Sequence, residues 1–206
     1  MGNWVKEITD LRIAALEIEH GYYLELDELF DLFDTADHAY QRVYDENHQL
    51  FETAAGSSHN HQAWEGGYMD HLLEVLNIAC QQYNWMSRAR KLPFKLADAL
   101  QVLYLHDVEK PFKVSKTLTY KGLSYEATKA HRKQLRAAVI EDYGISLTAE
   151  QENALEYVEG VPDNKYTPGE RTMGELAAFC HSCDILSARM WHDKGKDVNL
   201  GSSRWE

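Results

Sequence analysis

Helical periodicity runs through most of this 206-residue chain and constrains its fold more than any other feature. Apolar residues recur three or four positions apart, strand-like alternation is almost absent, and the chain has only 4 prolines. Such spacing gives a helix one apolar face, which must be buried against another element. The sequence therefore predicts an all-α fold of packed amphipathic helices.

Breaks in this pattern divide the chain into expected elements. Two amphipathic helices are expected over residues 3–20 and 24–55, and a loop over residues 59–67. Residues 108–126 contain Pro111, Gly122 and a Thr-Leu-Thr-Tyr run, which predict a loop or a small hairpin. Further helices are expected over residues 68–85, 93–107, 126–143, 148–160 and 167–191.

The signals at helix ends support several of these boundaries. Gly144 suits the position after a helix end, and Thr148 with Gln151 has the spacing of a capping box. Thr167, Pro168 and Glu170 repeat that kind of start. We expect an N-terminal helical extension over residues 1–55 that packs on the core, a main domain over 56–192 and a polar tail over 193–206.

Composition excludes several classes of protein. A formal net charge of -12 makes a long nucleic acid an unlikely partner, because the phosphate backbone attracts basic residues. Cys80, Cys180 and Cys183 are too few for a disulfide framework and lie in apolar helical stretches, where we interpret them as core residues. The N-terminus lacks the apolar segment of a signal peptide, and no stretch is long enough to span a bilayer. We expect a soluble, cytoplasmic protein that does not bind membranes.

Four residues in three of the expected helices carry the strongest chemical signal. His106 and Asp107 are adjacent at the end of an apolar helix, so both can reach one cation. His71 shares the inward face of its helix with Val75. Asp184 lies inside an apolar helix, where a carboxylate needs a cation or an arginine. Together they form a mixed nitrogen and oxygen ligand set for one divalent metal, with Mn, Mg, Co, Zn, Fe and Ni not distinguished.

The order of these residues resembles a known family. His71-x-x-x-Val75-x-x-x-Ala79, then His106-Asp107-x-x-Lys110, then Asp184 in an Ala/Cys-rich helix resembles the pattern of the HD-domain superfamily of metal-dependent phosphohydrolases. The resemblance covers roughly residues 56–192. It implies an HD-type helical bundle, a bound divalent cation and hydrolysis of a phosphate ester or anhydride.

The segment before His71, with its Gly-Gly turn, looks like the entry of HD-domain exoribonucleases and related phosphohydrolases. In this family that segment often meets the substrate, which makes His59 and His61 substrate-binding candidates; the alternative is a solvated loop. The chain departs from the family pattern at Glu109, where a small residue is frequent. Between the His-Asp pair and Asp184 it offers only His131 and His181, which favours one metal over two.

A basic run follows the His-Asp pair. Between residues 110 and 136 the only acidic residue is Glu126, whereas Lys and Arg are frequent. Such a run is often a solvated helix face, but its position beside the ligands makes a phosphate-binding rim at least as plausible. The candidate substrate-binding residues in it are Lys113, Lys116, Lys121, His131 and Arg132.

The leading functional hypothesis is hydrolysis of a small phosphorylated substrate, a nucleoside monophosphate or a dNTP, by a metal-activated water. Asp107 would ligate the metal and orient the water, Lys110 would offset charge on the phosphate, and Glu74 or Glu109 would be the general base. A phosphodiesterase for a cyclic or signal nucleotide or a short RNA end is the first alternative. A non-catalytic nucleotide-binding regulator is the second. The N-terminal helices offer a surface for a homo-oligomer.

Overall fold

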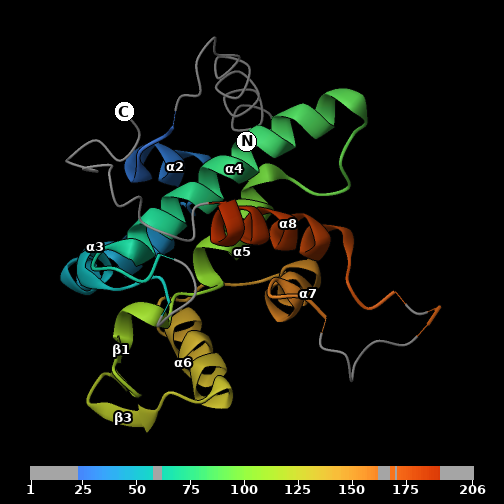
Figure 1. The fold of residues 1–206 in the computed structure, drawn as a ribbon. Helices are drawn as coiled ribbons and strands as arrows, with labels where there is room; N and C mark the ends of the chain where they lie inside the picture. The colour runs from blue at the N-terminus through green and yellow to red at the C-terminus, as the bar shows by residue number, and fades with distance from the viewer. Residues whose placement is uncertain (1–22, 58–61, 162–167, 170, 191–206) are drawn as a thin grey trace.

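The computed structural model describes residues 23–57, 62–161, 168–169 and 171–190, and helices dominate this part of the chain (Figure 1). The helices are α2 Leu26–Phe33, α3 Ala39–Thr53, α4 Gly67–Ala89, α5 Leu96–Leu105, α6 Lys129–Asp142, α7 Ala149–Tyr157 and α8 Glu175–Met190. The helix expected over residues 3–20, the candidates His59 and His61, and the tail over 193–206 lie outside the described residues.

A small antiparallel sheet interrupts the helices, so the fold is mostly helical and not strictly all-α. A 3-10 helix, Lys110–Phe112, leads into β1 Lys113–Val114, β2 Thr117–Tyr120 and β3 Leu123–Glu126. The strands pair in the order β1-β2-β3, with Leu118 opposite Tyr125. This confirms the expected turn-rich segment. Figure 1 shows the sheet and α6 at one end of the molecule, away from α2.

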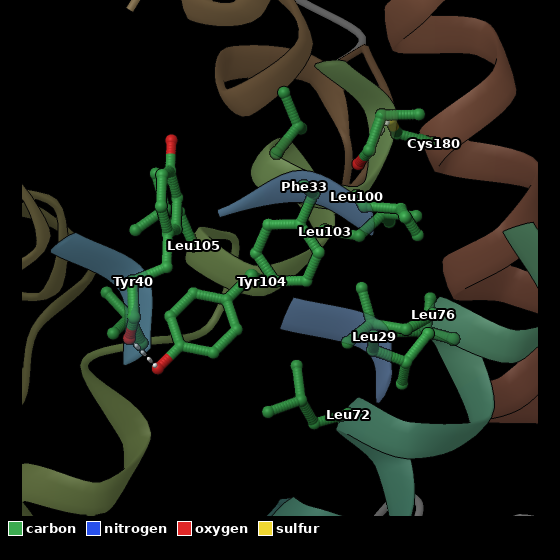
Figure 2. Close-up of a cluster of buried hydrophobic side chains, with 14 of the residues drawn as sticks. Leu29, Phe33, Tyr40, Leu72, Leu76, Leu100, Leu103, Tyr104, Leu105 and Cys180 are labelled. Carbon is green, nitrogen blue, oxygen red and sulfur yellow. Dashed lines mark hydrogen bonds between the residues drawn. The ribbon is translucent and has the colours of Figure 1, made fainter. Parts of the chain in front are cut away.

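Helix α5 lies at the centre of the core. It packs against α2, α4, α7 and α8, and Leu100, Leu103 and Tyr104 of α5 meet Leu29 of α2 and Leu76 of α4 (Figure 2). Each fully buried leucine contributes about 1.5–3 kcal/mol through removal of apolar surface from water. Because most residues of α5 are buried, the residues that follow it have fixed positions.

The single helix expected over residues 24–55 is wrong, because the structure divides it into α2 and α3. Asp34 ends α2, and its carboxylate accepts hydrogen bonds from the backbone N–H groups of Tyr40 at 3.0 Å and Gln41 at 3.1 Å. These are donors of the first turn of α3 that have no partner inside the helix. Asp34 therefore stabilises the start of a new helix with a different direction.

Three helix starts were also placed too early by the sequence. Helix α5 begins at Leu96, after Pro93, α6 begins at Lys129 instead of residue 126, and α8 begins at Glu175 instead of residue 167. The side chain of Asn153 in α7 explains the difference at α8. It accepts from the Gly174 N–H at 2.9 Å and donates to the Thr172 carbonyl at 3.0 Å, so these backbone groups bond to α7 before α8 starts.

Other local predictions are confirmed. Thr148 and Gln151 form the expected capping box, and Gly144 follows α6 with a φ of 67°, the left-handed conformation that favours glycine. The three cysteines are free and buried. Among the helices that the structure describes, none combines the length and apolar character needed to cross a bilayer.

Candidate metal centre

Three packed helices bring the predicted ligands together. His71 lies on the buried face of α4, His106 and Asp107 directly follow the last residue of α5, and Asp184 lies on α8. Helix α4 packs against both α5 and α8, as Figure 1 shows. The side chains are almost closed off from solvent, with exposed fractions of 0% for His71, 1% for His106, 8% for Asp107 and 16% for Asp184.

The candidate ligand atoms of four residues converge on one point. We call these residues the cluster: His71, His106, Asp107 and Asp184. The Nε2 atoms of His71 and His106 lie 3.2 Å apart. Asp184 Oδ1 lies 3.3 Å from the first and 3.6 Å from the second. His71, His106 and Asp184 each offer a ligand atom within 4.8 Å of the others, so this group could hold a metal ion. Asp107 Oδ2 lies 3.2 Å from His106 Nε2 and 3.8 Å from His71 Nε2.

The orientation of His106 is set by the backbone. Its Nδ1–H donates to the Leu103 carbonyl oxygen at 2.6 Å, an atom that can only accept. Nε2 is therefore the nitrogen that faces the cluster. Burial alone lowers the pKa of His106, but the carboxylates of Asp107 and Asp184 outweigh burial and raise this pKa to about 10. The cluster thus favours positive charge at this point.

The two carboxylates respond to the same surroundings. Burial raises the pKa of Asp184, but its contacts with His106 and His71 outweigh burial and hold that pKa well below its usual range. Burial also raises the pKa of Asp107, but the charges of Lys110 and His106 outweigh burial and hold this pKa well below its usual range. Lys110 forms an ion pair with Asp107 Oδ2 one turn further along the chain. Both carboxylates are therefore ionised at neutral pH.

Glu74 lies on α4 behind His71, on the side away from the cluster. Its Oε2 accepts a hydrogen bond from the Ser187 hydroxyl at 2.7 Å and another from the Gln62 amide at 2.7 Å. Burial raises the pKa of Glu74 to about 7, although these hydrogen bonds lower it. The sequence suggested Glu74 as a general base, but the structure directs its carboxylate to Ser187 and Gln62, away from the point where the ligand atoms meet.

Glu109, the other carboxylate suggested as a base, is buried beside α6. Its exposed fraction is 1%, and Oε2 lies 3.4 Å from Arg136 Nε. Neither carboxylate oxygen has a hydrogen-bond partner among the described residues. Burial raises the pKa of Glu109, against the effect of Arg136. Glu109 lines the cavity described next, so it reaches the same space as the cluster.

A cavity of about 680 Å³ opens onto the cluster. His106, Asp107 and Asp184 form part of its wall, and Lys110, Lys113 and Arg132 from the basic run form another part. The Nε–H of Arg132 is buried and has no hydrogen-bond partner in the described part of the chain. Cationic side chains and the cluster therefore face one space, as the sequence predicted for Lys113 and Arg132. The remaining lining residues are Ala55, Gly56, Ser57, Ala63, Glu109, Ser115, Leu118, Ala127 and Glu159.

The structure does not place Lys116, Lys121 or His131 in the cavity wall. Lys121 lies in the turn between β2 and β3 and forms an ion pair with Asp142 at 2.8 Å. The Nδ1–H of His131 donates to the Glu126 carbonyl at 2.7 Å, where it holds the end of β3. Successive side chains of a strand point to opposite faces, and those of a helix point in different directions around its axis, so only part of the basic run can reach the cluster.

Two residues beside the cluster, Ser187 and Gln62, were not predicted from the sequence. Ser187 lies three positions after Asp184, so helical spacing puts it on the same face and could have revealed it. Gln62 is buried with an exposed fraction of 0%, but no sequence pattern marks it. Its place depends on a backbone φ of 42° and on the Gly56 N–H, which donates to the Gln62 carbonyl at 2.9 Å.

No protein-family model, no curated protein and no solved structure matches this chain. The resemblance to the HD-domain superfamily therefore depends on the order and the geometry of the chain's own residues.

Proposed function

We propose that this protein is a metal-dependent phosphohydrolase of the HD type that acts on a nucleotide, either a nucleoside monophosphate or a dNTP. One observation carries the proposal. Two buried imidazole nitrogens and two carboxylate oxygens meet at the wall of a cavity that Lys110, Lys113 and Arg132 also line. A cation centre beside positive side chains is the combination that phosphate transfer requires.

The donor set fits a divalent cation. His106 presents Nε2 because its Nδ1–H is bonded to a carbonyl, and the Asp184 and Asp107 carboxylates are held in ionised form. We assign Asp107 as the fourth ligand, beside His71, His106 and Asp184. Imidazole and carboxylate ligands suit several first-row divalent metals. The chemistry that such a cation supplies is polarisation of a phosphate oxygen and a bound water of lowered pKa.

The chain's own side chains have distinct roles in this proposal. Lys110 is held by Asp107 at the cluster edge, so its ammonium offsets charge on the reacting phosphate. Lys113 and Arg132 lie further along the cavity wall and bind anionic groups that do not react. The Arg132 Nε–H, buried without a hydrogen-bond partner among the described residues, gains one when a phosphate oxygen enters.

The cavity has a suitable size for a nucleotide. Its volume of about 680 Å³ falls within the range of roughly 300–1,000 Å³ that is usual for small-molecule sites. Long nucleic acid fits less well, because the net charge of the chain is -12.

Metal analysis combined with phosphate release tests the proposal. The full chain is purified, its metal content is measured, and each divalent metal is tested with nucleoside monophosphates, dNTPs, cyclic nucleotides and short RNA. Asp184→Asn is the inactive control. Metal-dependent release of phosphate from the first two groups supports the proposal. Activity on cyclic nucleotides or RNA ends alone would instead indicate a phosphodiesterase, and nucleotide binding without turnover a regulator.

A further inference from the structure

A buried chain of polar groups stands behind His71. The Nδ1 atom of His71 lies 2.9 Å from Ser187 Oγ, and Ser187 Oγ donates to Glu74 Oε2 at 2.7 Å. The Gln62 amide donates to the same Glu74 oxygen at 2.7 Å and to the Ser187 backbone carbonyl at 3.3 Å. Each of these side chains is almost completely buried, so water does not replace the contacts.

The orientation of the Gln62 amide in this chain of groups follows from one backbone atom. The Ser187 carbonyl can only accept, so the Gln62 atom that faces it is the amide nitrogen and not the amide oxygen. That nitrogen also donates to Glu74 Oε2, which makes this oxygen an acceptor. The Ser187 hydroxyl donates to the same oxygen of the ionised Glu74 carboxylate, and its lone pairs are left for His71.

His71 must therefore donate through Nδ1, and its Nε2 lone pair points into the cluster. We propose that Ser187, Glu74 and Gln62 are positioning residues that hold His71 in the Nδ1–H tautomer and so prepare Nε2 to bind a metal. This inference rests on the proposed function only in taking the cluster as a metal site. It assigns to Glu74 a role that differs from general base.

The arrangement explains why the two histidines have different supports. His106 donates to a carbonyl three residues earlier in its own helix, Leu103, and needs no other element. His71 depends on α8 and on the segment before α4. Partners behind a ligating histidine fix its tautomer and ring orientation and raise its basicity, and their loss typically weakens metal affinity about 10–100-fold.

The local backbone keeps Gln62 in place. A Cβ atom at Gly67 would lie 2.0 Å from the Gln62 carbonyl oxygen, so only glycine allows this close approach at the start of α4. Gln62 itself has a φ of 42°, an uncommon conformation for a residue with a side chain. Strained backbone of this kind persists where surrounding contacts determine it. Here the contacts are those of the Gln62 side chain and carbonyl.

Nuclear magnetic resonance of the full chain tests the inference directly. Long-range ¹H–¹⁵N spectra of ¹⁵N-histidine protein at neutral pH, without added metal, distinguish the two neutral tautomers of each histidine. We expect the Nδ1–H form for His71 in the wild type and a shift toward the Nε2–H form in Ser187→Ala. Ser187→Thr, which keeps the hydroxyl, should restore the wild-type spectrum. Ser182→Ala on the same helix is the matched control and should not change it.

Calorimetric titration with Zn²⁺ gives the second measurement. We expect Ser187→Ala to weaken zinc binding about 10–100-fold and Ser182→Ala to leave it unchanged. If Ser187→Ala does not fold, Glu74→Gln replaces it and should weaken zinc binding about 10-fold, since the carboxylate no longer raises the basicity of His71.

An unchanged His71 tautomer in Ser187→Ala, or unchanged zinc affinity in the variant that folds, would overturn the inference. Failure of the proposed function looks different. A wild-type protein that neither binds a divalent metal nor releases phosphate contradicts the phosphohydrolase, whereas the tautomer of His71 still decides whether Ser187 and Glu74 act as proposed.

Discussion

The cluster and the lysines of the basic run that lie outside the cavity wall are held in opposite ways. The cluster residues lie on three helices that pack against one another, and their side chains are at most 16% exposed. The lysines of the basic run lie on a short sheet and on α6, and Lys121 and Lys133 are 61% and 45% exposed. A buried ligand has one available geometry, whereas an exposed ammonium can move and exchange its partner for water.

This difference predicts how each region responds to mutation. Loss of a cluster residue leaves the remaining buried charges without a partner, which is costly in a low-dielectric interior. Loss of an exposed lysine removes an interaction that water and salt already weaken. Large effects on metal binding and activity should therefore come from the cluster, and smaller, graded effects on substrate affinity from the basic run.

The largest effect is expected for Asp184→Asn. The change removes a charged ligand atom that lies 3.3 Å and 3.6 Å from the two imidazole nitrogens. Metal affinity and kcat/KM should each fall more than about 100-fold, because even residues behind a ligand cost about 10–100-fold. Calorimetry and steady-state kinetics measure both quantities. Asp142→Asn, at an exposed ion pair, is the control, and equal losses in the two variants would remove the distinction between the regions.

The second effect concerns stability. Burial raises the pKa of Glu74 from 4.5 to about 7. Below pH 4.5 this carboxyl is protonated in both the folded and the unfolded chain. Between pH 4.5 and about 7 only the unfolded chain loses this proton, so the contribution of Glu74 to the free energy of unfolding falls as pH rises, by on the order of 3 kcal/mol, and then levels off.

Urea denaturation of the metal-free protein across this pH range checks the expected slope. Burial lowers the pKa of His71 to about 4, which contributes with the opposite sign over nearly the same range, so the measured quantity is the difference between the wild type and Glu74→Gln. That difference should change across the range because the glutamine does not titrate, while the exposed Glu152→Gln should follow the wild type. A difference that stays constant between pH 4.5 and 7 would show that Glu74 is ionised in the folded protein without penalty.

A smaller effect is expected for Arg132→Ala. Its Nε–H lies in the cavity wall without a hydrogen-bond partner among the residues that the structure describes, and a phosphate oxygen would supply one. KM should rise about 10-fold with little change in kcat, equivalent to about 1.4 kcal/mol. Kinetics at two ionic strengths measure this, and a fall in kcat with unchanged KM would assign Arg132 to the reacting phosphate instead.

The smallest effect is expected for Lys121→Ala. Sequence position alone suggested that Lys121 lines the substrate entrance, but its ammonium is paired with Asp142 and lies over the Tyr120 ring at 5.6 Å. KM should stay within about twofold of the wild type, and stability should fall by no more than about 1 kcal/mol. A several-fold rise in KM would show that the turn between β2 and β3 reaches the substrate after all.

The sequence was most informative where helical spacing determines direction. His71, His106, Asp107 and Asp184 were found because a side chain on the apolar face of a helix must point inward, and helices that share a core bring such side chains together. The capping box at Thr148 was predicted from the spacing of Thr148 and Gln151, a local motif that does not depend on contacts between distant residues.

The sequence failed where a distant partner decides the local structure. Asn153 delays the start of α8 by binding the backbone near Gly174, and Asp34 divides one expected helix into two. Gln62 occupies its place only because Gly56 and Gly67 allow the backbone to approach. Side chains of the basic run point both toward the cavity and away from it. Charge alone therefore did not distinguish Arg132, which lines the cavity, from Lys121, which pairs with Asp142.

The wide separation of the cluster residues along the chain has a consequence for how the protein is made. A nascent polypeptide contains both imidazoles long before the ribosome reaches Asp184 and Ser187, which α8 supplies together. Helix α8 also closes the core against α4 and α7. Assembly of the candidate metal centre therefore requires α8 to dock, and a chain in which α8 has not docked brings together only part of the proposed ligand set.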